Sequence, residues 1–137
     1  MADDFPVKIY HNPDCGTSRN TLAMIEAAGY VPNIVDYRAT GWTRPLLDQL
    51  LAAMQASPRD LLRDKGTPAA ELGLLDPAAA DETILEAMLA HPILVNRPIV
   101  VTPLGTKLCR PSEAVLPLLD HVPTSFTKED GEVVIGR

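Results

Sequence analysis

The chain has 137 residues, a length typical of one domain, and a formal net charge of −6 from 12 basic and 18 acidic side chains. Apolar residues make up 46% of it, which excludes a disordered chain, and no apolar run approaches the ~18 residues of a membrane span. The acidic balance and the 4% aromatic content argue against nucleic-acid binding. We therefore expect one domain over residues 1–137 that binds neither nucleic acid nor membrane.

The N-terminus and the cysteine count bear on the compartment. The first residues are acidic and lack an apolar stretch, so no export signal is predicted and we expect a cytoplasmic protein. Two cysteines, Cys15 and Cys109, are too few for a disulfide scaffold. The three histidines are scattered, and no pair of Cys or His has ligand spacing, so we expect no metal site.

The first 37 residues predict a β-α-β unit. Residues 7–10 alternate in polarity, as strands do, and residues 16–28 show helical apolar spacing that ends before Gly29. A second strand is predicted over residues 32–37. Such a unit usually pairs two parallel strands through a right-handed crossover.

The middle of the chain predicts a helical insert over about residues 41–91. Residues 44–54 carry leucines at helical spacing behind Thr43, a residue type that caps helices. Ser57 opens a second helix, with proline next and an acid in capping-box position. A third helix is predicted over residues 81–90.

Strand patterns return in the last third of the chain. Residues 99–101 and 107–110 predict two paired strands around a turn. A last helix is predicted over residues 112–119, kinked or shortened by Pro117. The tail, residues 123–137, is mixed and polar, and we expect it to be partly ordered. The element order predicts an α/β fold with one mixed sheet and a helical insertion.

Cys15 is the main candidate for chemistry because it lies where the first strand leads into the first helix. The unpaired N–H groups and the dipole at a helix start favour a thiolate, the nucleophilic form of cysteine. His11, four residues earlier, and Arg19, four residues later, could each add positive charge. The alternative is that Cys15 is a small buried residue beside a helix start, and the residues alone leave both interpretations open.

The pattern around Cys15 is C-x-x-S. Ser18 stands where a second cysteine would resolve a mixed disulfide, so the resolving thiol must come from elsewhere. Cys109 is the only internal candidate. It lies on a predicted strand, and a cysteine in such a position is more often a buried apolar residue.

Three arginines lie at the ends of predicted elements and could bind an oxyanion through their planar forks: Arg63, Arg97 and Arg110. For any single arginine the usual alternative is a solvated or ion-paired surface group.

Five blocks of the sequence together resemble a known family. They are residues 10–22 (YHNPDCGTSRNTL), 61–63 (LLR), 91–106 (HPILVNRPIVVTPLGT), 108–113 (LCRPSE) and 126–132 (FTKEDGE). The chain resembles the glutaredoxin-dependent arsenate reductases, which have a thioredoxin-like fold. The resemblance spans nearly the whole chain.

The resemblance implies roles for single residues. Cys15 matches the catalytic nucleophile, His11 the histidine that lowers its pKa, and Ser18 a residue that hydrogen-bonds the thiolate. Cys109 matches a cysteine that the family does not require, and Pro98 a cis-proline. Three residues match the arginines that bind the arsenic oxyanion: Arg63, Arg97 and Arg110.

The resemblance also implies a reaction. The thiolate attacks arsenate, glutathione attacks the adduct as a cosubstrate, and glutaredoxin reduces the mixed species as arsenite leaves. No bound metal or organic cofactor is implied. Two alternatives remain: a redox regulator of the Spx type, whose members typically carry C-x-x-C, and a general glutathione-dependent thiol oxidoreductase, which would not need three anion-binding arginines.

Overall fold

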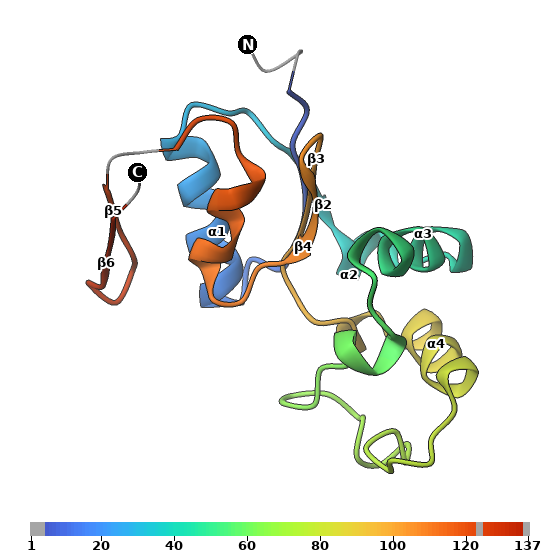
Figure 1. The fold of residues 1–137 in the computed structure, drawn as a ribbon. Helices are drawn as coiled ribbons and strands as arrows, with labels where there is room; N and C mark the ends of the chain where they lie inside the picture. The colour runs from blue at the N-terminus through green and yellow to red at the C-terminus, as the bar shows by residue number, and fades with distance from the viewer. Residues whose placement is uncertain (1–4, 123–124, 136–137) are drawn as a thin grey trace. The chain divides into compact units, whose positions relative to one another are not determined.

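The computed structural model describes residues 5–122 and 125–135 (Figure 1). The contacts within the chain divide it into two compact units. The first comprises Met1–Asp36 and Arg97–Arg137, and the second comprises Tyr37–Asn96.

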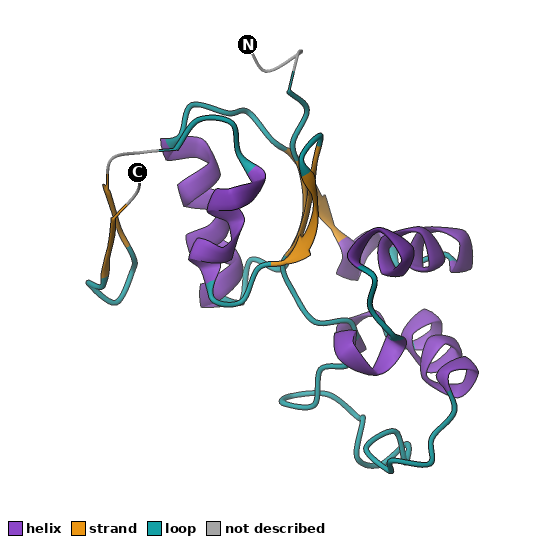
Figure 2. Ribbon diagram, viewed as in Figure 1, coloured by secondary structure: helices purple, strands orange, loops and turns teal. Residues whose placement is uncertain are grey.

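The first unit is built on a four-stranded mixed sheet, which is seen edge-on in orange in Figure 2, and its strand order is β2-β1-β3-β4. The strands are β1 (Lys8–His11), β2 (Asn33–Asp36), β3 (Ile99–Thr102) and β4 (Gly105–Leu108). β1 pairs parallel with β2 and antiparallel with β3, which pairs antiparallel with β4. The helix α1 (Gly16–Ala27) connects β1 to β2, so the predicted β-α-β unit and the mixed α/β sheet are confirmed.

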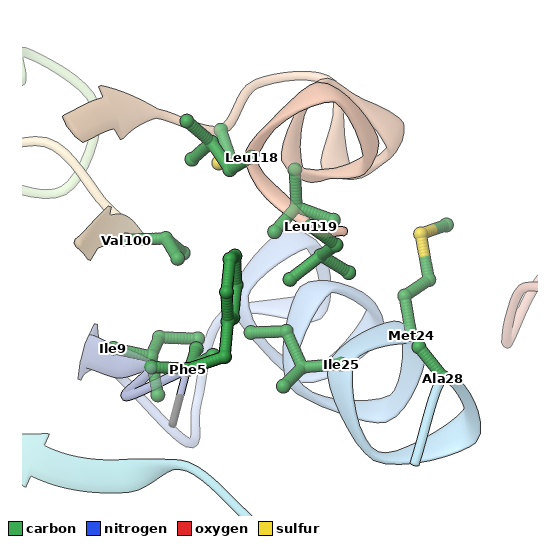
Figure 3. Packing of buried hydrophobic residues seen from close by; sticks show 11 residues of the cluster. Phe5, Ile9, Met24, Ile25, Ala28, Val100, Leu118 and Leu119 are labelled. Atoms are coloured by element: carbon green, nitrogen blue, oxygen red, sulfur yellow. The ribbon is translucent and has the colours of Figure 1, made fainter. Parts of the chain in front are cut away.

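Two helices cover one face of this sheet. α1 lies beside η3 (Ser112–Leu118), a 3₁₀ helix, and both pack against the strands (Figure 1). Figure 3 shows Ile25 of α1 and Leu119 after η3 meeting Phe5, Ile9 and Val100. Burial of each such side chain stabilises the fold by about 1.5–3 kcal/mol, so this core holds α1 and η3 against the sheet.

Two predicted boundaries near the C-terminus were wrong. β4 begins at Gly105, not at residue 107, because Gly105 adopts a φ of 150° that lets the chain reverse directly after Thr102. The strand consequently ends at Leu108, so Cys109 and Arg110 follow it. The predicted last helix is 3₁₀ in form and contains Pro117, which cannot donate a backbone hydrogen bond.

The second unit is helical. It contains α2 (Tyr37–Thr40), α3 (Arg44–Met54), η1 (Pro58–Leu61), α4 (Asp81–Ala90) and η2 (Pro92–Leu94). The predicted helices over residues 44–54 and 81–90 are confirmed, and the Thr43 hydroxyl caps α3 by accepting from the N–H of Leu46 at 3.3 Å. The helix predicted to start at Ser57 is a single 3₁₀ turn. The short helix α2 begins at Tyr37, which the sequence pattern assigned to a strand.

The C-terminal residues form a hairpin that the sequence pattern did not predict. β5 (Ser125–Thr127) pairs antiparallel with β6 (Val133–Ile135), and the N–H of Lys128 donates to the carbonyl of Glu132 at 2.8 Å. Of the tail that we expected to be partly ordered, residues 123–124 and 136–137 lie outside the described residues. No helix in the described ranges has the length and apolar character needed to cross a membrane.

Candidate active site

The loop between β1 and α1 places Cys15 at the helix start. Asn12 turns the chain: its carbonyl accepts from the N–H of Cys15 at 3.0 Å, and its side chain accepts from the N–H of Asp14 at 2.9 Å. Asparagine favours such turns because its side chain can replace a backbone acceptor. Cys15 keeps an extended backbone as the N-cap residue of α1, which confirms its predicted position.

The surroundings of the Cys15 sulfur favour the thiolate. Burial alone would raise the pKa of Cys15, but the backbone N–H of Ser18 and the guanidinium groups of Arg110 and Arg97 outweigh burial and lower the pKa to about 7. The Nη1 atom of Arg110 lies 3.7 Å from Sγ. Because the side chain is only 9% exposed, these donors act on a sulfur largely shielded from water.

The register of the sheet explains why Arg97 and Arg110 meet at this sulfur. Arg97 precedes β3 and Arg110 follows β4, and the pairing of Ile99 with Leu108 brings these two chain ends together. Tyr10, near the end of β1, pairs with Ile99, so the loop that carries Cys15 starts at the same edge of the sheet. Arg110 Nη1 also donates to the carbonyl of Arg97 at 2.8 Å, which orients its guanidinium. The peptide bonds Arg97–Pro98 and Arg110–Pro111 are both cis.

His11 and Ser18 contact each other in this structure. The Nδ1 atom of His11 lies 2.6 Å from the Ser18 hydroxyl oxygen, which also accepts from the N–H of Asn12 at 3.0 Å. All three residues are buried. The Ser18 hydroxyl thus ties the end of β1 to α1, while its backbone N–H favours the Cys15 thiolate.

Arg63, the third predicted oxyanion ligand, belongs to the second unit. Its backbone N–H donates to the carbonyl of Leu94 at 2.8 Å, and its Nε donates to the carbonyl of Lys65 at 3.3 Å. Its participation with Arg97 and Arg110 remains a prediction.

Cys109 differs from Cys15 in the extent of its burial and in the direction in which its pKa is shifted. Its side chain is fully buried, and burial raises the pKa of its thiol to about 12. Its sulfur lies 3.7 Å from the carbonyl oxygen of Lys107. A buried thiol of high pKa is a poor nucleophile, and both cysteines are free. Across residues 5–122 and 125–135, no group of three His, Cys, Asp or Glu side chains could hold a metal ion.

Arg19 has a partner that the sequence analysis missed. Glu129 on the hairpin accepts from Nε and Nη2 of Arg19 at 2.9 and 3.0 Å, and this pair raises the pKa of Arg19. The third nitrogen, Nη1, donates to the carbonyl of Pro13 at 2.8 Å. Arg19 therefore binds the loop and the hairpin. No local pattern reveals a pair whose members are 110 positions apart.

A comparison with family models matches residues 10–118 to the ArsC family. The chain belongs to the ArsC family. The match includes the Cys15 loop, Arg63, Arg97 and Arg110, but it ends before the hairpin.

Named relatives in the ArsC family cover almost the whole chain. An arsenate reductase of Synechocystis is 59% identical over 130 residues, which are 94% of this chain and 93% of that protein. An arsenate reductase of Rhizobium meliloti is 58% identical, with 94% and 93% covered. The solved arsenate reductase of Vibrio cholerae is 37% identical, has a TM-score of 0.79, and matches 84% of this chain and 98% of its own. The fold is the thioredoxin-like fold of the ArsC family.

Proposed function

We propose that this chain reduces arsenate to arsenite in arsenic detoxification, with Cys15 as the nucleophile. The observation that carries the proposal is the Cys15 sulfur at the start of α1, whose pKa is lowered to about 7 beside Arg110 and Arg97. A cysteine with this pKa is about half ionised at pH 7 and can attack an electrophilic centre as the thiolate. The names of the relatives provide the substrate, arsenate.

Arg97 and Arg110 reduce the electrostatic repulsion between arsenate and the Cys15 thiolate. Arsenate is negatively charged at neutral pH, and so are the thiolate that attacks it and the chain as a whole, at −6. Arg97 and Arg110 beside the sulfur offset this repulsion and can hold the oxyanion through paired N–H donors. Arg63 would supply a third fork. The same donors stabilise the charge that develops on the arsenate oxygens as the S–As bond forms.

The reaction needs two electrons from thiols. The Cys15 sulfur displaces one oxygen of arsenate, which leaves as water after protonation. Glutathione then attacks the arsenic of the adduct, and a second oxygen leaves as water, so that arsenic carries both the Cys15 sulfur and the glutathione sulfur. A glutaredoxin thiolate takes the glutathione sulfur in a new S–S bond, the electron pair of the broken S–As bond stays with arsenic, and arsenite leaves as water cleaves the remaining bond to Cys15. The reducing thiol must come from outside the chain, because Ser18 has no thiol and Cys109 is buried with its pKa raised to about 12.

A coupled assay tests this function. The purified chain is mixed with glutathione, glutaredoxin, glutathione reductase and NADPH, and the loss of NADPH is followed with and without arsenate, together with direct detection of arsenite. We expect NADPH consumption that requires arsenate and matches the arsenite formed. Consumption with a small disulfide but not with arsenate would identify a general thiol oxidoreductase. No turnover with either substrate, together with binding to RNA polymerase, would favour a regulator.

A further inference from the structure

The C-terminal hairpin reaches the start of α1 through Glu129. Its carboxylate holds two nitrogens of Arg19, and its backbone N–H donates to the side-chain oxygen of Asn20 at 3.0 Å. A methyl group added to Gly16 would lie 4.0 Å from Glu129 Oε1 and 3.7 Å from Arg19 Nη2. The ion pair therefore lies next to the residue that follows Cys15.

The hairpin also contacts η3, another element of the first unit. Lys128 Nζ lies 2.7 Å from Glu113 Oε1 in η3 and 3.1 Å from Glu132 Oε1 in the hairpin. The Lys128 side chain is only 9% exposed, so this cation is largely covered. Since its neighbour Lys128 is tied to η3, Glu129 is held by an element other than α1.

Arg19 connects this anchored carboxylate to the Cys15 loop. Two of its nitrogens bind Glu129, and the remaining one donates to the carbonyl of Pro13 at 2.8 Å. A guanidinium is planar, so fixing two nitrogens on a carboxylate sets the direction of the third. The contacts run in order from Glu129 through Arg19 to Pro13, two residues before the nucleophile.

We propose that Glu129 is a positioning residue for Cys15. Through Arg19 it holds the loop at Pro13, and so keeps the Cys15 sulfur against the Ser18 N–H and the Arg110 guanidinium. Arg19 and Glu129 are 43% and 51% exposed, so we expect the pair to add little to the overall stability of the fold and to act on the Cys15 loop that it contacts. The proposal rests on the proposed function only in taking Cys15 as the nucleophile.

The charge of Glu129 and a positioning role of Glu129 predict opposite shifts in the pKa of Cys15 when Glu129 is replaced. If the carboxylate acted only through its charge, its loss would leave Arg19 uncompensated and would lower the pKa of Cys15. If it acts by position, its loss frees Arg19 and the loop, weakens the contacts of the sulfur with Ser18 and Arg110, and raises the pKa. The direction of the pKa shift therefore separates the two causes.

The experiment measures the alkylation rate of Cys15 by iodoacetamide against pH in the full chain. In Glu129→Ala we expect the midpoint to rise, with the rate at pH 7 falling about twofold as the thiolate fraction drops. Glu26→Ala removes the same charge from an exposed residue of α1 that takes no part in the contacts of Arg19 or Lys128, and should keep the wild-type midpoint. With arsenate, Glu129→Ala should lower kcat and leave KM within about twofold, because Glu129 does not contact the arginines at the sulfur.

Arg19→Lys gives an independent test. Lysine keeps the charge but cannot bind Glu129 and Pro13 in one planar arrangement. A positioning role therefore predicts a raised midpoint of Cys15 alkylation, whereas an effect of charge alone predicts an unchanged midpoint. If circular dichroism shows that Glu129→Ala does not fold, Arg19→Lys tests the proposal in its place. An unchanged or lowered midpoint in the folded variants would overturn the proposal. Alkylation of Cys15 needs no arsenate. If the wild-type chain did not turn over arsenate, the proposed function would be refuted, but the alkylation midpoints would still test the role of Glu129.

Discussion

The Nη1 atom of Arg110 lies 3.7 Å from the sulfur of Cys15, although the two residues are 95 positions apart in the sequence. The same nitrogen donates to the carbonyl of Arg97 at 2.8 Å, so the guanidinium is oriented before any substrate binds. A donor fixed in advance costs no reorganisation when charge develops on the reacting atoms. The first unit therefore favours the thiolate and presents two arginine side chains beside it.

The two cysteines should respond differently to replacement. Cys15→Ser removes the thiolate and should abolish arsenate reduction, because a serine hydroxyl is not ionised near neutral pH. Cys109→Ser should keep most of the activity, since that thiol is buried with its pKa raised to about 12. The coupled NADPH assay measures both variants. Equal losses in the two variants would indicate an internal disulfide relay in place of external glutathione.

The reactivity of Cys15 should follow pH with a midpoint near 7. The fold lowers the pKa of this thiol from 9.0 to about 7, so the thiolate forms as pH rises through 7. The alkylation rate at pH 6 should be about a tenth of its plateau value. By linkage, the stabilisation from this group is complete above pH 9 and is lost as pH falls through 7. Cys15→Ser should lack that pH dependence of unfolding, and a midpoint at or above 9.0 would contradict the electrostatic assignment.

Replacement of Arg110 should affect both the nucleophile and the substrate. In Arg110→Ala we expect the pKa of Cys15 to rise, and kcat/KM to fall about 10- to 150-fold from the loss of a charged hydrogen bond worth ~1.5–3 kcal/mol. Arg110→Lys keeps the charge but cannot serve the sulfur and the Arg97 carbonyl with one planar group, so it should rescue only part of the loss. Arg44→Ala, which removes an exposed arginine of α3, is the matched control. Wild-type kinetics in Arg110→Ala would remove Arg110 from the site.

The sequence predicted the elements whose patterns are local. The helix of residues 16–28 and its start at Cys15 follow from apolar spacing and the glycine at its end, and both are confirmed. The end of β4 was misjudged because the turn after Thr102 depends on the backbone conformation of Gly105, which composition does not reveal. The hairpin of residues 125–135 was missed because its strands have only three residues each.

The site was predicted to the extent that the family resemblance supplied it. Spacing alone could not bring Arg97 and Arg110 to Cys15, since the pairing of β3 with β4 does so. The sequence suggested Arg19 as a positive charge for the thiol, but Arg19 binds Glu129, which is 110 positions away. A helix side chain such as that of Arg19 could pair with many residues of the chain, and only the folded structure shows which contact forms.

Ser18→Ala tests the link between β1 and α1. Loss of the hydroxyl leaves the buried N–H of Asn12 without the acceptor it has at 3.0 Å, and removes the partner of His11 Nδ1. An unsatisfied buried donor costs about 1–3 kcal/mol, so the free energy of unfolding in urea should fall by that amount. Ser125→Ala, an exposed serine in β5, should leave it unchanged. Equal free energies of unfolding in Ser18→Ala and Ser125→Ala would show that the hydrogen bond from the Asn12 N–H to Ser18 does not stabilise the loop.

Arg63 should act on the substrate and not on the nucleophile. It lies in the second unit, and the resemblance assigns it to the oxyanion, so Arg63→Ala should raise the KM for arsenate about 10-fold or more. The alkylation rate of Cys15 should stay at its wild-type value, because the N–H of Ser18, Arg110 and Arg97 lower that pKa. Lys65→Ala removes the same charge from an exposed neighbour and serves as the control. If Arg63→Ala and Lys65→Ala both keep the wild-type KM, the oxyanion is bound without Arg63.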